Sequence, residues 1–95
     1  MNEHDFGVLV DMMQSSLAND GTAKNYLSHL RRFRTWCVEQ DVSLETVDIV
    51  HVKQYFNEMK SHYSNTSSLK QIRGALRLAY RQMGELVQTV RISFA

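Results

Sequence analysis

The chain has 95 residues and is 43% hydrophobic, which suits the core of one small domain. It has no apolar run long enough to span a bilayer, no basic and apolar leader typical of a secretory signal, and only one cysteine, Cys37, which cannot form an internal disulfide. We therefore expect a cytoplasmic protein without a membrane partner.

The basic residues are distributed unevenly, although the formal net charge is only +1. Residues 22–38 contain four basic residues and no acidic one, and the same is true of residues 66–83. The rest of the chain holds three basic and ten acidic residues, a formal charge of −7. A basic surface on an acidic body favours a polyanion as the partner, with nucleic acid as the first candidate.

The apolar pattern predicts an all-α fold of four helices, at about residues 5–17, 22–40, 46–63 and 65–83. The lack of proline and the presence of only four glycines also favour helices over a sheet sandwich. In the first helix the apolar residues recur every three or four positions: Phe6, Leu9, Val10, Met13 and Leu17. Residues 18–21 then form a break, because asparagine and glycine favour turns.

The second predicted helix has an apolar row and a basic row on opposite sides. Thr22 is a plausible N-cap. The apolar row consists of Tyr26, Leu30, Phe33 and Cys37, with Trp36 beside it. At about 100° per residue, the opposite side carries Lys24, Ser28, Arg31 and Thr35, with Arg32 at its border. Arg34 lies nearer the edge of the core, along which its methylene groups can pack.

The third predicted helix is mainly a core element. Asp48 in its first turn suits the positive end of the helix dipole. Leu44, in the preceding connection, is expected to plug the core. The buried row of the helix is expected to be Ile49, Val52, Tyr55, Phe56 and Met59.

The fourth predicted helix carries the second basic row. Ser64 or Asn65 is expected to cap it, and Gly84 is expected to end it. Its apolar face is expected to hold Leu69, Ile72, Leu76, Ala79, Tyr80 and Met83. Four cations lie within an arc of about 80°: Lys70, Arg73, Arg77 and Arg81. Like charges on one helix face repel each other, so an arc without acidic residues lowers helix stability; it indicates either a solvated face or a binding surface.

Other reactive side chains have simpler structural interpretations. Phe33 and Trp36 could stack on unpaired bases, but their helical spacing favours packing in the core. Cys37 lies in the apolar row and has no matching Cys-His motif, so it is expected to be a small core residue. The four histidines do not show the spacing of metal ligands, so we expect no metal site and no cofactor.

The second to fourth segments together resemble the amino-terminal core-binding domain of tyrosine recombinases, the phage integrase family. The resemblance covers about two thirds of the chain. The matching residues are Thr22-x-x-x-Tyr26-x-x-x-Leu30-x-x-Phe33-x-x-Trp36-Cys37, Leu44-x-x-Val47-Asp48, Val52-x-x-Tyr55-Phe56, and Ser64-Asn65-Thr66-Ser67-Ser68-Leu69 leading into Ile72-Arg73-x-Ala75-Leu76-x-x-x-Tyr80-x-x-x-Gly84.

The resemblance implies a compact four-helix SAM-like bundle whose second and fourth helices approach the major groove of duplex DNA. Catalysis in that family belongs to a separate domain with an Arg…His-x-x-Arg…Tyr set. None of the tyrosines of this chain lies in a context that matches the nucleophile of that set. The sequence His29-x-x-Arg32 has the spacing of His-x-x-Arg, but it falls inside the pattern of the binding domain, so we interpret it as a coincidence. We therefore interpret the chain as a binding module of a recombinase and not as an enzyme in itself, with residues 1–85 as the domain and 86–95 as a tail or linker.

The predicted partners are double-stranded DNA and other protomers of the same recombinase assembled on it. Arginine and lysine mostly contact phosphates, whereas glutamine and arginine can also read base edges. The predicted DNA-binding residues are Lys24, Ser28, Arg31, Arg32, Thr66, Ser67, Lys70, Gln71, Arg73, Arg77 and Arg81. Two alternatives stay open: a helical protein-interaction domain that meets an acidic partner, and a small stand-alone DNA-binding regulator.

Overall fold

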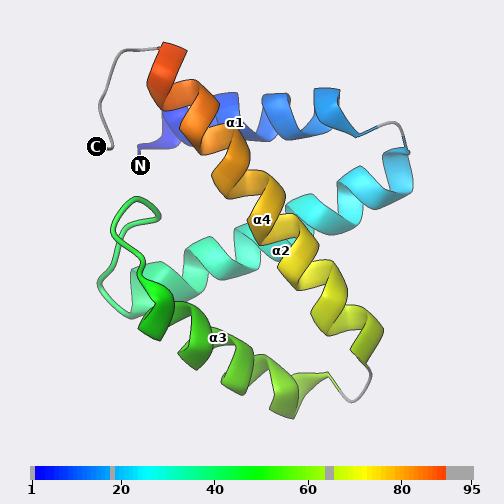
Figure 1. Cartoon of the computed structure of the whole chain (residues 1–95), viewed down its shortest axis with the longest axis vertical. Coiled ribbons are helices and arrows are strands. Elements are labelled where there is room, and N and C mark those ends of the chain that lie inside the picture. The colour runs from blue at the N-terminus through cyan, green and yellow to red at the C-terminus, as the bar shows by residue number, and fades with distance from the viewer. Residues whose placement is uncertain (1, 18, 64–65, 90–95) are drawn as a thin grey trace.

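The computed structural model describes residues 2–17, 19–63 and 66–89, with side chains as far as Gly84. It contains four helices: α1 (Glu3–Ser16), α2 (Asp20–Glu39), α3 (Ile49–His62) and α4 (Thr66–Thr89). These residues include no strand, so the predicted all-α fold of four helices is confirmed. Helix α4 crosses over α2, and α1 and α3 lie on opposite sides of the crossing (Figure 1).

Polar side chains ahead of α2 and α3 determine where these helices begin. The Asn19 side chain accepts a hydrogen bond from the Thr22 backbone N–H at 3.0 Å, so α2 begins earlier than predicted and Thr22 is not its N-cap. The Asp48 carboxylate accepts hydrogen bonds from the backbone N–H groups of Val50 and His51, so Asp48 precedes α3. The predicted start at residue 46 is therefore too early.

Helix α4 continues past its predicted end at residue 83. Gly84 is helical, and none of the described glycines has a positive φ, so the prediction that it ends the helix is wrong. The preceding turn is held by tertiary contacts, because Met83 is buried and the Gln82 side-chain amide donates to the Ser16 hydroxyl at 2.6 Å. Outside the described residues lie the predicted caps Ser64 and Asn65 and residues 90–95 of the predicted tail.

One hydrophobic core joins the four helices. Leu44 is 3% exposed, which confirms that it plugs the core. Ile49 is 66% exposed, so its predicted burial is wrong; as the first residue after the Asp48 cap, it points outward from α3. The largest fully buried side chains are Leu9, Met13, Leu30, Phe33, Cys37, Tyr55 and Ile72. This core fixes which sides of α2 and α4 face solvent.

Candidate nucleic-acid interface

Four cations on α4 form one exposed surface, which we name the α4 stripe: Lys70, Arg73, Arg77 and Arg81. None of them forms an ion pair with a described side chain. Residues 66–84 of α4 contain no acidic residue. Three polar residues near the start of the helix are also exposed: Thr66, Ser67 and Gln71. The stripe is therefore a row of cations that a polyanion can approach along about three turns of helix.

The predicted residues on α2 are also exposed, and we name them the α2 stripe: Lys24, Ser28, Arg31 and Arg32. Their neighbours differ from those of the α4 stripe. Lys24 and Arg31 line a groove of about 320 Å³ with Asp20 and with Gln14 of α1. Arg32 lies over the Tyr63 ring, with its guanidinium carbon 5.7 Å from the ring centroid.

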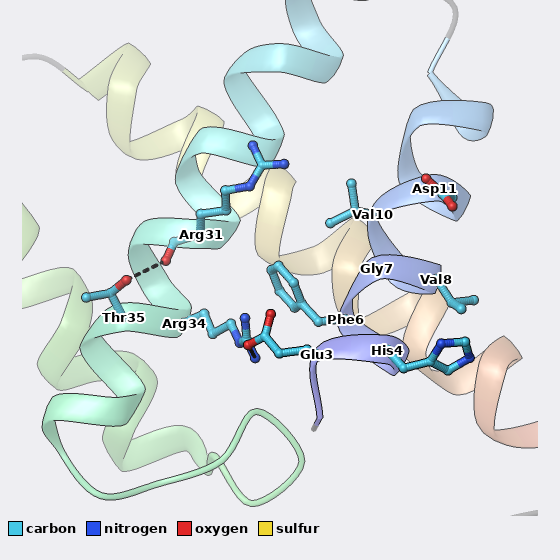
Figure 2. Close-up of a pocket in the computed structure, with 10 residues that line it drawn as sticks. All are labelled: Glu3, His4, Phe6, Gly7, Val8, Val10, Asp11, Arg31, Arg34 and Thr35. Carbon is cyan, nitrogen blue, oxygen red and sulfur yellow. Dashed lines mark hydrogen bonds and ion pairs between the residues drawn. The ribbon is translucent and has the colours of Figure 1, made fainter.

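Acidic residues line the same grooves as the α2 stripe. The groove between α1 and α2 is lined by Glu3 and Asp11 as well as by Arg31, and Glu3 lies against Arg34 (Figure 2). A second groove, between α2 and α3, is lined by both Arg31 and Arg32 together with Glu39 and Glu58. The α2 stripe therefore lies in a mixed electrostatic environment, although residues 22–38 of the sequence contain no acid.

Arg34, the fourth cation of this part of α2, packs against α1 and is half-buried. Its guanidinium carbon lies 4.2 Å from the centroid of the Phe6 ring, and it pairs with the Glu3 carboxylate at 2.5 Å. The hydrogen bond from Arg34, and then its positive charge, lower the pKa of Glu3 below its ordinary value. The prediction that Arg34 lies at the edge of the core is confirmed, and this residue ties α1 to α2.

Part of the α2 stripe lies away from the crossing of α2 and α4. The Tyr26 side chain of α2 meets Gly74 of α4 where the helices cross. Lys24 and Ser28 are each two residues from Tyr26, or about 160° around α2. Residues of the α2 stripe line three grooves, and none of these grooves includes a described residue of α4. Figure 2 views the groove between α1 and α2, and α4 passes behind both helices in this view.

The crossing of α2 and α4 holds three residues that the sequence did not identify as candidates for the interface: Tyr26, His29 and Gly74. Burial lowers the pKa of His29; a hydrogen bond with the Gln71 side chain opposes this shift, and the charge of Arg32 adds to it. The Nδ1 atom of His29 is buried without a hydrogen-bond partner among the described residues. The sequence contained one signal for the crossing, which is Gly74. Glycine inside a helix costs about 1 kcal/mol of stability relative to alanine, so its presence there indicates a site where another group packs closely against the helix.

The aromatic and thiol groups that could suggest chemistry are part of the core. Trp36 stacks on Phe33 with ring centroids 5.8 Å apart and donates from its indole N–H to Glu58 at 2.7 Å, so the predicted core role of both rings is confirmed. Cys37 is 1% exposed, and burial raises its pKa to about 11. The Tyr80 hydroxyl donates to the backbone carbonyl of Leu44 at 2.9 Å. These groups stabilise the domain and leave its polar surface to contact partners.

One comparison with known proteins identifies a family. The family model of the phage integrase N-terminal SAM-like domain matches residues 8–87, which include both stripes. Comparisons with curated proteins and with solved structures give no match. None of the described helices is both long enough and apolar enough to cross a membrane.

Proposed function

Since the chain belongs to the family of N-terminal SAM-like domains of phage integrases, we propose that it is the duplex DNA-binding module of a site-specific tyrosine recombinase. The observation that carries this proposal is the α4 stripe, an exposed row of four cations without an ion-pair partner among the described side chains. Its lysine and arginines bind phosphates. Thr66, Ser67 and Gln71, near the start of α4, reach base edges in the major groove.

The α2 stripe takes a secondary part in the same proposal. Lys24 and Ser28 face away from the α4 crossing, so they do not contact the stretch of duplex that the α4 stripe holds. Lys24, Ser28, Arg31 and Arg32 instead attract DNA from a distance and contact phosphates outside that stretch. Nearby carboxylates on α1 and α3 weaken this attraction.

The chemistry of recombination belongs to another domain in this proposal. The matched family model describes an N-terminal domain, and in this proposal residues 8–87 hold DNA without cutting it. We propose that the parent protein is a cytoplasmic tyrosine recombinase whose protomers assemble on DNA, and that its catalytic domain supplies the Arg…His-x-x-Arg…Tyr set. A second linked module raises the effective concentration of the first on its site, so the isolated domain binds more weakly than the parent.

A salt titration with a short fluorescent duplex of mixed sequence tests the proposal. Counterion release predicts that the slope of log K against log salt changes by about 0.9 for each phosphate that the protein no longer neutralises. The double variant Lys70→Ala/Arg77→Ala should therefore lower the magnitude of the slope by about 1.8. The matched control is Lys53→Ala/Lys60→Ala, which removes two exposed cations of α3 and should leave the slope nearly unchanged.

Two results would overturn the proposal. If the wild-type domain does not bind duplex DNA even at the lowest salt, the basic surface serves a different partner, and a protein-interaction domain becomes the better interpretation. If the α3 control lowers the slope as much as the α4 variant does, the binding reflects total charge and not the α4 stripe.

A further inference from the structure

Gly74 allows a tyrosine of α2 to lie directly against the backbone of α4. A Cβ atom at position 74 would be 2.5 Å from the Tyr26 hydroxyl oxygen and 3.1 Å from the ring carbon that bears it. Gly74 has a helical conformation without a positive φ, so its backbone does not require glycine. A residue larger than glycine at position 74 would prevent the close approach of Tyr26.

The Tyr26 hydroxyl lies against Gly74, on the side of α4 that carries three cations of the α4 stripe. By helical geometry, Arg81, Lys70 and Arg77 are about 20°, 40° and 60° around α4 from Gly74. All three cations are exposed, and Tyr26 is half-buried. Its hydroxyl makes no hydrogen bond with a described residue. A phenol can donate one hydrogen bond, and this donor is therefore free for an acceptor that the surrounding cations attract.

We infer that the Tyr26 hydroxyl donates a hydrogen bond to a DNA phosphate within the α4 stripe, and that Gly74 is the positioning residue that makes this contact possible. The inference rests on the proposed function. Lys70 and Arg81 are 11 residues apart, or about 16 Å along α4, a length that matches a row of backbone phosphates better than one free anion. Tyrosine hydroxyls are among the neutral groups that contact phosphates in protein–DNA complexes.

The variant Tyr26→Phe tests the contact because it removes the hydroxyl and keeps the ring. We expect it to lower the affinity for duplex DNA about five-fold, the effect of removing one hydrogen bond. The slope of log K against log salt should not change, because no charge is removed. The matched control is Tyr55→Phe, which deletes a hydroxyl that is buried in the core without a described partner and should not change the affinity.

The outcomes separate this inference from the proposed function. If Tyr26→Phe binds as tightly as the wild type while Lys70→Ala/Arg77→Ala flattens the salt slope, the domain binds DNA but the tyrosine contact is wrong. If the wild type does not bind duplex DNA, both statements fail. A changed slope for Tyr26→Phe would also overturn the inference, because the substitution would then act through the cations.

A double-mutant cycle tests the role of Gly74. Gly74→Ala places a methyl carbon 2.5 Å from the Tyr26 hydroxyl oxygen and displaces it, so we expect the variant to weaken binding at least about five-fold in the wild-type background. In the Tyr26→Phe background the same change should have little further effect, because the hydroxyl contact is already absent. Equal decreases in affinity in the two backgrounds would show that Gly74 acts independently of Tyr26. Circular dichroism checks that each variant is folded.

Discussion

The stripes on α2 and α4 carry the same kinds of side chain but lie in different surroundings. The α4 stripe is exposed along a segment without acids, and none of its cations pairs with a described side chain. The α2 stripe comes from a segment that is equally free of acids, but the fold places Glu3 and Asp11 of α1 and Glu58 of α3 in the grooves that the stripe lines. The local sequence therefore gives only part of the field at a surface, because neighbouring helices contribute the rest.

The largest expected effect compares the two stripes directly. Lys70→Ala/Arg77→Ala should weaken duplex binding on the order of 50-fold at 0.1 M salt, since two phosphates are no longer neutralised. Lys24→Ala/Arg31→Ala removes the same charge from the α2 stripe and should lower the salt slope by less than about 0.9, the value for one phosphate. Fluorescence anisotropy over a salt series measures both. Equal slopes for the two variants would mean that both stripes hold the duplex directly.

A smaller effect separates structural from binding arginines. Arg34→Ala should lower the free energy of unfolding by about 1 kcal/mol, because it removes the cation–π interaction with Phe6 and the packing of the arginine stem. Arg77→Ala should not lower it, because removing one of several like charges relieves repulsion by a few tenths of a kcal/mol. Urea denaturation measures both variants.

The same two variants should have the opposite order of effects on DNA binding, with the larger effect for Arg77→Ala. Arg77→Ala should flatten the salt slope, whereas Arg34→Ala should leave it unchanged at temperatures where the variant is folded. If Arg34→Ala flattened the slope and left the stability intact, Arg34 would belong to the binding surface, and its pairing with Glu3 would be incidental.

The helical period predicted those features that depend on one helix at a time. The four helices, the burial of Phe33 and Cys37, and the exposure of the α4 stripe follow from which side of each helix is apolar. The helix start at Asn19 was missed because the cap lies three residues before Thr22, in the break. The carboxylates that share grooves with Arg31 and the contact of Tyr26 with Gly74 depend on how the helices pack against one another. The helical period of the sequence carries no information about this packing.

The smallest expected effect concerns pH and tests the crossing of the two helices. Burial holds the pKa of His29 below its ordinary value of 6.5. The unfolded chain therefore binds a proton more readily than the folded domain does. This contribution to stability is complete above pH 6.5 and decreases as the pH falls through 6.5 toward the lower pKa of the folded state.

Thermal unfolding at pH 7.5 and 5.5 can show the contribution of His29 to this dependence. The wild type should lose more of its thermal stability between these values than His29→Gln does, because glutamine does not titrate. Glu3 and Asp48, whose pKa values are lowered by their hydrogen bonds, titrate below this window and do not confuse the comparison. His62→Gln changes an exposed imidazole of α3 and serves as the control. If His29→Gln loses as much stability as the wild type, protonation of His29 is not coupled to the packing of α2 on α4.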